Sequence, residues 1–106
     1  MNEEIEPVLV GSVDDLEVGS VENFEYEDLN YAIFHLESGF FATQGSCNCD
    51  ETALLSESDI QGEELECANC NNTYSIVSGD ATSNPELPPL KIFDISEEDN
   101  QIYLNI

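Results

Sequence analysis

Apolar and polar residues alternate along most of the chain with a period of two, which is typical of β-strands. Turn-forming residues interrupt the alternation every eight to ten residues in the first half. No segment has the pattern of a helix longer than two turns. We therefore expect an all-β fold, a sandwich or barrel built on an antiparallel meander. The predicted strands are residues 5–10, 21–26, 31–36, 40–43, 63–67, 73–77, 91–95 and 102–106.

The segments between these strands have their own signals. Pro7 places the first strand at a sheet edge, since proline cannot donate a ladder hydrogen bond. Residues 12–16 are expected to form one helical turn, capped by Ser12 and ended at Gly19. Turns are expected at residues 28–30, 38–39, 78–79 and 97–100, and a proline-rich loop at 84–89.

All four cysteines lie in one stretch, as C-x-C (Cys47 and Cys49) and C-x-x-C (Cys67 and Cys70), with seventeen residues between the pairs. Two close pairs of soft ligands on separate loops are typical of a sulfur-bound metal centre. Gly45 and Asn48 are expected to supply backbone freedom for the sharp first loop. Disulfides are the weaker alternative, because a C-x-C bridge closes a small strained ring.

A chain of 106 residues predicts one compact domain, residues 1–106, with a modest core. Its first ten residues contain no basic region and no long apolar run, so we expect neither a signal peptide nor a membrane anchor. This pattern favours the cytoplasm, where cysteines more often bind metals than form bridges.

The charge is strongly one-sided, with 24 acidic residues against the single base Lys91 and a formal net charge of −23. This excludes nucleic acids and anionic membranes as partners, because both require basic contacts. The acids are spread along the sequence, which favours adaptation to salt first and steering toward a basic partner second. A chain of this size and charge is expected to be a monomer.

The motifs together resemble the Rieske-type [2Fe–2S] ferredoxins, small carriers that supply electrons to ring-hydroxylating oxygenases. The resemblance covers nearly the whole chain and rests on FFATQGSC at 40–47, GEELEC at 62–67, LKIF at 90–93 and NQIY at 100–103. It implies a Rieske-like fold with a cluster-binding subdomain at about residues 44–74. Pro85 falls where the third loop of the family closes over its cluster.

Both histidine ligands of the family are replaced here, because Cys49 and Cys70 occupy their positions. Asn71 takes the place of a common glycine and tolerates a left-handed conformation. The resemblance assigns Cys47 and Cys67 to the inner iron and Cys49 and Cys70 to the outer iron. An all-cysteine [2Fe–2S] cluster is favoured, and a single Zn²⁺ or Fe ion among four thiolates is the alternative.

The other residues that could take part in chemistry are expected to have structural roles. His35 is expected to be a solvent-facing strand residue, and Phe40 and Phe41 to belong to the core. Tyr74 is also expected to be a core residue, although it lies four residues after Cys70 and its hydroxyl could donate to a cluster sulfur. Asp50, Glu51 and Glu66 are expected to be solvated charges. No nucleophile accompanies them, so we do not expect an enzyme.

Three functions remain open on the sequence. The favoured function is a ferredoxin that passes single electrons between a reductase and an oxygenase or another redox partner, which would have a basic docking surface. The second is a structural or regulatory module that holds zinc, and the third is a subunit whose thiols cycle between dithiol and disulfide.

Overall fold

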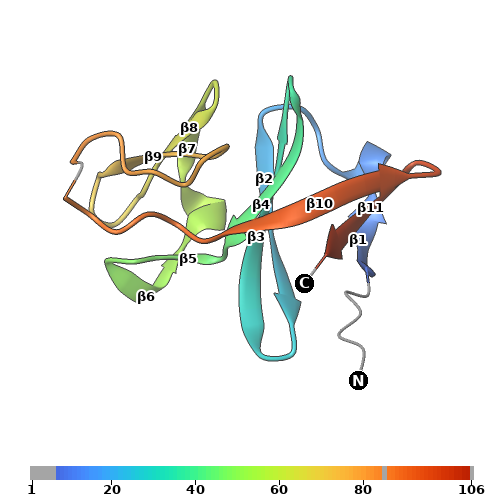
Figure 1. Cartoon of the computed structure of the whole chain (residues 1–106), viewed down its shortest axis with the longest axis horizontal. Coiled ribbons are helices and arrows are strands. Elements are labelled where there is room, and N and C mark those ends of the chain that lie inside the picture. The colour runs from blue at the N-terminus through green and yellow to red at the C-terminus, as the bar shows by residue number, and fades with distance from the viewer. Residues whose placement is uncertain (1–6, 85, 106) are drawn as a thin grey trace.

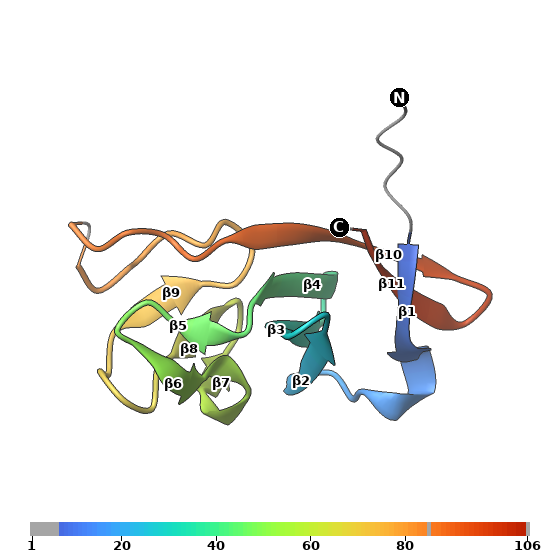
Figure 2. The same ribbon diagram turned by 90° about the horizontal axis from the view of Figure 1, so that it is seen from below.

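The computed structural model describes residues 7–84 and 86–105 and contains two packed parts (Figure 1). One part is a six-stranded antiparallel sheet, and the other is a group of short strands that carries the cysteines. Turning the molecule by 90° shows the same division, with the loop before β10 leading from the cysteine-bearing part into the large sheet (Figure 2). The sequence-based expectation of an all-β fold is confirmed.

The large sheet is built from the two ends of the chain and the meander between them. Its strand order is β1-β11-β10-β4-β3-β2, and every pair of neighbours is antiparallel. A 3₁₀ turn, η1 (Val13–Asp15), follows the first strand. The strands are β1 (Pro7–Ser12), β2 (Ser20–Tyr26), β3 (Leu29–Leu36), β4 (Gly39–Gln44), β10 (Ile92–Glu98) and β11 (Gln101–Asn105).

Strand β3 lies between two hydrophobic cores, which explains why its sequence is apolar on both faces. Tyr31 and Ile33 belong to the core of the large sheet, together with Ala42 and Leu104. The alternate residues of β3, from Ala32 to Leu36, belong to a second core that also contains Cys47, Cys67 and Tyr74. The cysteine-bearing part is therefore fixed to the large sheet by buried apolar surface.

The cysteine-bearing part consists of short strands in two small sheets. One sheet is the hairpin β5–β6 and the other has the order β7-β8-β9. A second 3₁₀ turn, η2 (Leu55–Glu57), lies between β6 and β7 and buries Leu55. The strands are β5 (Ser46–Cys47), β6 (Asp50–Leu54), β7 (Asp59–Gln61), β8 (Glu64–Glu66) and β9 (Thr73–Ser75).

The predicted strands are found with small shifts, and Pro7 does begin an edge strand, as expected. Residues 5, 6 and 106 of the predicted terminal strands lie outside the described residues. Three details of the predicted turns were wrong. The helical turn stops at Leu16 rather than at Gly19, and the β2–β3 turn is centred on residues 27–28 rather than 28–30. The β10–β11 turn is confined to residues 99–100 rather than 97–100, because residues 97–98 still pair with β11. The strands β5, β6 and β7 were not predicted.

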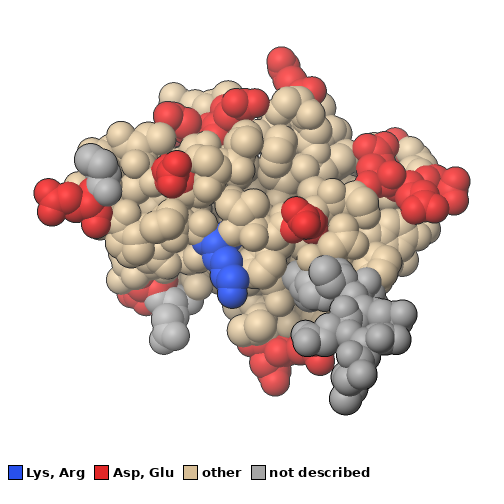
Figure 3. All heavy atoms as spheres, viewed as in Figure 1, with Lys and Arg blue, Asp and Glu red and all other residues tan. Residues whose placement is uncertain are grey.

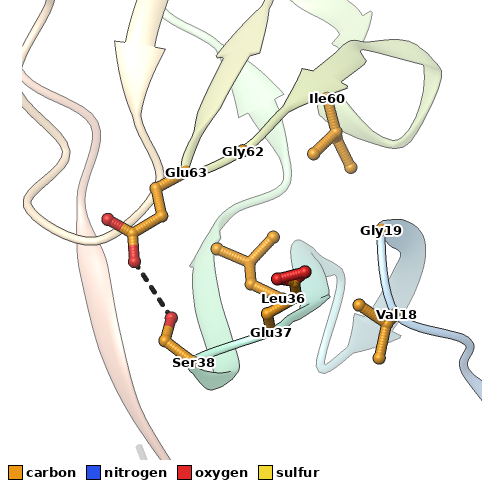
Figure 4. A pocket seen from close by; sticks show the side chains of 8 residues that line it. All are labelled: Val18, Gly19, Leu36, Glu37, Ser38, Ile60, Gly62 and Glu63. Atoms are coloured by element: carbon orange, nitrogen blue, oxygen red, sulfur yellow. Dashed lines mark hydrogen bonds between the residues drawn. The ribbon is translucent and has the colours of Figure 1, made fainter.

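A cleft of about 360 Å³ marks the seam between the two parts (Figure 4). The side chains of Val18, Leu36 and Ile60 supply its apolar lining. At its edge the Ser38 hydroxyl donates a 3.0 Å hydrogen bond to the Glu63 carboxylate, which connects the β3–β4 turn to the β7–β8 turn. None of the cysteines lines the cleft. Within the described residues, no helix is long and apolar enough to cross a bilayer.

Candidate metal centre

Two hairpin loops carry the four cysteines and face each other. Cys47 ends β5, and Cys49 lies in the tight turn that leads into β6. Cys67 follows β8 directly, and Cys70 lies in the turn before β9. Because β5–β6 and β8–β9 both pack against the core that contains Cys47 and Cys67, the loops approach each other at their cysteines.

The four thiols form one compact group. Their Sγ atoms all lie within 4.8 Å of one another, and the group contains no other His, Cys, Asp or Glu among the described residues. The distance from Cys47 Sγ to Cys70 Sγ is 3.8 Å, and that from Cys49 Sγ to Cys67 Sγ is also 3.8 Å. The structure thus brings together all four residues that the sequence singled out.

The group has a buried side and a surface side. Cys47 and Cys67 are buried, with exposed fractions of 3% and 1%, whereas Cys49 is exposed and Cys70 is half-buried. Any metal held by these thiols would therefore be fixed to the core through one pair and approach the surface at the other pair. Access of this kind suits electron exchange with another protein.

Gly45 has a different role from the one predicted, because its φ is not in the left-handed region. It is buried where the first cysteine loop crosses the start of β3. A Cβ atom at this position would lie 2.4 Å from the Asn30 carbonyl carbon and 2.4 Å from Asn30 Cβ. The Gly45 N–H donates to the Asn30 carbonyl oxygen at 2.8 Å, and the Gly45 carbonyl accepts from the Leu55 N–H at 2.8 Å. The glycine thus permits a close approach between backbones.

Asn48 also acts through its side chain rather than through backbone freedom, since its φ is not positive either. Its Nδ2 donates to the carbonyl oxygens of Pro88 and Pro89 at 3.1 and 3.2 Å. Gln44 Nε2 in turn donates to Asn48 Oδ1 at 2.8 Å and to the Ser46 carbonyl oxygen at 2.7 Å. This network, which the sequence did not reveal, holds the first cysteine loop against the proline-rich loop.

The second loop is closed by backbone hydrogen bonds around a left-handed residue. Asn71 has φ = 64°, as its position in the motif predicted. Its N–H donates to the Cys67 carbonyl at 2.9 Å, and the Cys67 N–H donates to the Asn72 carbonyl at 2.9 Å. Asn69 Nδ2 lies 3.5 Å from Cys49 Sγ, so this loop also contacts a thiol of the other loop.

Hydrogen bonding and burial make the thiols unequal. Burial raises the pKa of Cys47 to about 12, although the backbone N–H of Cys49 donates to it. Burial acts in the same direction on Cys70, but hydrogen bonds from Asn72 and from neighbouring thiols outweigh it and lower the pKa of Cys70 to about 7. Burial and the Cys47 thiol together raise the pKa of Tyr74 to about 12. Cys70 therefore ionises more easily than Cys47 or Cys49, whose pKa values are raised.

The Tyr74 side chain belongs to the core, as predicted, and also contacts the site. It is 1% exposed, and its hydroxyl lies beside the Cys47 thiol, which contributes to its raised pKa. Phe40 and Phe41 are confirmed as core residues, half-buried against the sheet core and the cysteine-side core respectively. His35 was wrongly expected to face solvent. It is half-buried, its Nδ1 lies 2.6 Å from the Leu16 carbonyl oxygen, and its ring stacks on Phe40 at 4.0 Å.

The acidic residues near the loops make local contacts. Asp50 is exposed, as expected, and accepts hydrogen bonds from the Thr52 N–H and hydroxyl at 2.9 and 2.8 Å. Glu66 is half-buried rather than fully solvated and accepts from Asn71 Nδ2 at 3.2 Å. The side chain of Glu51 and the predicted cluster-covering Pro85 lie outside the described residues.

Four convergent thiols are a donor set for sulfur-loving metals. Thiolates bind Zn²⁺, single iron ions and iron–sulfur clusters, whereas magnesium and calcium prefer oxygen ligands. The chemistry of the donors therefore fits a [2Fe–2S] cluster, which the four cysteines would hold as its only protein ligands. Such a cluster would supply a one-electron redox couple.

The fold and this sulfur site together define a class of small β-proteins with a metal-binding thiol site, and the comparison with families places the chain within it. A family model described as the Rieske [2Fe-2S] domain matches residues 6–94. The chain therefore belongs to the Rieske [2Fe-2S] domain family, as its sequence motifs indicated.

Relatives within the family are ferredoxin components of dioxygenase systems. The biphenyl dioxygenase ferredoxin subunit of Pseudomonas sp. (strain KKS102) is 28% identical over 94 residues, which cover 89% of this chain and 86% of the relative. The 3-phenylpropionate/cinnamic acid dioxygenase ferredoxin subunit of Photorhabdus laumondii is 27% identical and covers 93% of both chains. The ferredoxin of carbazole 1,9a-dioxygenase from Nocardioides aromaticivorans has the same fold, with a TM-score of 0.85, 22% identity, and coverage of 93% of this chain and 96% of that one.

Proposed function

We propose that this chain is an electron carrier whose redox centre is held by Cys47, Cys49, Cys67 and Cys70 alone. In the manner of its family, the centre would be a [2Fe–2S] cluster, here with four thiolate ligands. The observation that carries the proposal is the convergence of all four thiols within 4.8 Å on the two loops of a Rieske domain. Residues 1–106 would form a single domain, with residues 44–74 as its cluster-binding subdomain.

The carrier would pass single electrons between a reductase and an oxygenase-type acceptor. Support comes from its relatives, which are named as ferredoxin subunits of dioxygenases. A further support is the graded exposure of the thiols, because Cys49 and Cys70 approach the surface while Cys47 and Cys67 do not. In this function the protein holds the centre and tunes its potential, and it is not itself an enzyme.

Docking would be electrostatic, on partners with basic surfaces. On the face drawn in Figure 3 the acidic side chains lie at several separate places, with a single basic side chain among them. Such a distribution fits adaptation of the whole surface to salt, and it also steers the chain toward a basic partner at low ionic strength. We further propose that the carrier is a monomer in the cytoplasm, where thiols stay reduced.

The redox potential tests the proposal. Replacing two neutral imidazoles with thiolates changes the charge of the oxidised centre from about 0 to about −2, which disfavours adding an electron. We therefore expect a midpoint below about −150 mV, the lower end of the range for His-ligated Rieske centres. The midpoint should also be nearly independent of pH between about 6 and 9, because no ligand imidazole titrates.

A matched variant strengthens this test. The double substitution Cys49→His and Cys70→His restores the ligand pattern of the family, so it should raise the midpoint into the His-ligated range and introduce a pH dependence. Reversible reduction of the iron-loaded protein at low potential would support the carrier. An iron-loaded protein that cannot be reduced reversibly, or whose midpoint lies above about −150 mV without these histidines, would reject it.

A further inference from the structure

The cleft at the seam between the two parts combines an apolar lining with carboxylates (Figure 4). Among its lining residues, Leu36 is buried, Ile60 is half-buried and Val18 is 56% exposed. Glu37 and Glu63 also line the cleft, and both residues are exposed. An apolar hollow with polar groups at its edge is a common form of binding site on protein surfaces.

Hydrogen bonds fix the segments that line this cleft. The Gly19 N–H donates to the His35 carbonyl oxygen at 2.6 Å, which attaches one wall of the cleft to β3. The Glu63 carbonyl oxygen accepts from the Ile76 N–H at 2.8 Å, so the opposite wall is attached to the residues after β9. The Ser38 hydroxyl also holds the Glu63 carboxylate. One carboxylate of the cleft is therefore oriented before anything binds.

The chain itself has almost no counter-charge to place in the cleft. Its single base, Lys91, lies over the Phe93 ring at 5.7 Å from the ring centre. Its only histidine, His35, has its Nδ1 at 2.6 Å from the Leu16 carbonyl oxygen. A cation fixed in the cleft would therefore have to come from another molecule.

The chemistry of the cleft restricts what can occupy it. Its carboxylates, in a chain of net charge −23, repel nucleotides, other anions and a second copy of this chain. A purely apolar group would cover the carboxylates without giving them partners. The volume of about 360 Å³ is small for a ligand site, which favours a single side chain. A cation on an apolar stem satisfies all three conditions, and lysine and arginine side chains have this structure.

Arginine fits the cleft better than lysine for a geometric reason. The Ser38 hydroxyl donates to one oxygen of the Glu63 carboxylate, Oε2, at 3.0 Å. Both carboxylate oxygens retain lone pairs, and a planar guanidinium donates to both at once, whereas an ammonium acts as a point charge. The methylene stem of the arginine would then lie against the apolar lining, which consists of Val18, Leu36 and Ile60.

We propose that this cleft binds an arginine side chain of a basic partner protein, through the Glu63 carboxylate and the apolar lining. The inference goes beyond the carrier function, because none of the cysteines lines the cleft and the binding requires no electron transfer. Docking of a partner at the cleft and electron exchange at the thiol site would use different residues of the chain.

The test is an NMR titration of the metal-loaded protein with a short peptide, acetyl-glycyl-arginyl-glycine amide. A KCl concentration of about 0.15 M screens charges that lie more than about 8 Å apart. We expect the methyl resonances of Val18, Leu36 and Ile60 to shift and to saturate. The same peptide with lysine in place of arginine should bind more weakly. A peptide with citrulline, which keeps the shape of arginine without its charge, should not bind.

Two adjacent glutamates provide a matched comparison. Glu63→Gln removes a carboxylate from the cleft and should weaken binding of the arginine peptide about three- to fivefold. Glu64→Gln removes the same charge at the next residue, which is exposed but does not line the cleft, so it should bind like the parent chain. Val18→Ser, at an exposed side chain, should also weaken binding by removing apolar contact. Circular dichroism of each variant checks that the fold is retained.

Three results would overturn the inference. They are equal binding of the citrulline peptide, equal losses in Glu63→Gln and Glu64→Gln, and the absence of saturable shifts at the cleft methyl groups. Equal losses in the two variants would mean that the net charge of the chain attracts the peptide, without a specific site. The carrier function is judged separately by reversible reduction of the iron-loaded protein, so either proposal can fail while the other stands.

Discussion

Replacing Gly45 with alanine tests whether the first cysteine loop is fixed by its close approach to the large sheet. The new Cβ would lie 2.4 Å from two atoms of Asn30, whereas ordinary contacts begin at 3.4 Å. The loop and the start of β3 must therefore separate by about 1 Å, given that overpacked groups relieve a clash by backbone shifts. That movement strains both 2.8 Å hydrogen bonds of Gly45, to Asn30 and from Leu55.

The cost can be estimated from these contacts. Overpacking of a buried position costs about 1–3 kcal/mol. Each weakened backbone hydrogen bond adds up to about 1 kcal/mol. We expect Gly45→Ala to lower the free energy of unfolding by about 2–4 kcal/mol, a large fraction of the roughly 5–15 kcal/mol that holds a small domain together.

Urea unfolding monitored by circular dichroism, with metal loading measured in parallel, provides the assay. Gly11→Ala is the matched control, because its nearest neighbour would be Asp15 Oδ2 at 3.8 Å and no positive φ is required there. The control should change stability by less than about 1 kcal/mol. If Gly45→Ala were as stable as Gly11→Ala and bound metal normally, the proposed role of the close approach would be wrong.

Three further predictions concern the site and the surface. Tyr74→Phe removes the hydroxyl beside the Cys47 thiol, a potential donor to this ligand sulfur, and should lower the midpoint of the iron-loaded protein by about 40 mV or more. Tyr103→Phe, whose hydroxyl bonds to Gln101, should leave the midpoint unchanged. In the metal-free chain iodoacetamide reacts with thiolates, so it should modify Cys70 as the pH rises through about 7 and leave Cys47 unmodified well above that pH. Mass spectrometry of the modified peptides measures this order of reaction. Raising KCl from low concentration to about 1 M should raise the melting temperature by about 5 °C or more at constant metal content, because the screening length of the acidic charges falls to about 3 Å. A melting temperature that does not change would favour steering toward a basic partner as the reason for the acidity.

The large sheet could be predicted from the sequence because its strands are long and follow simple patterns. Residues 31–36 are apolar at every position except His35, which matched a strand buried on both faces. Pro7 identified the edge strand correctly, because proline has no N–H to donate to a neighbouring strand whatever the rest of the chain does. The choice of the four cysteines also followed from spacing, since closely spaced ligands on loops can converge without long-range information.

The short strands around the cysteines could not be predicted in this way. Strands β5 and β7 have two and three residues, which are too few to show a period. The role of Gly45 was predicted wrongly because glycine is required there by the close contact with Asn30, fifteen residues earlier, and no local pattern reveals that contact. The bonds of Asn48 to residues 88–89 span about forty positions and leave no local signal.

The central claim is that sulfur atoms of four cysteines are the only protein ligands of the redox centre. X-ray absorption at the iron edge measures this most directly, because sulfur and nitrogen ligands differ in scattering and in bond length, about 2.3 Å against about 2.0–2.1 Å for zinc centres of similar geometry. We predict that only sulfur atoms ligate the iron in the iron-loaded protein, and that one of these sulfur ligands is lost in Cys49→Ser. A nitrogen or oxygen ligand in the parent protein would contradict the claim.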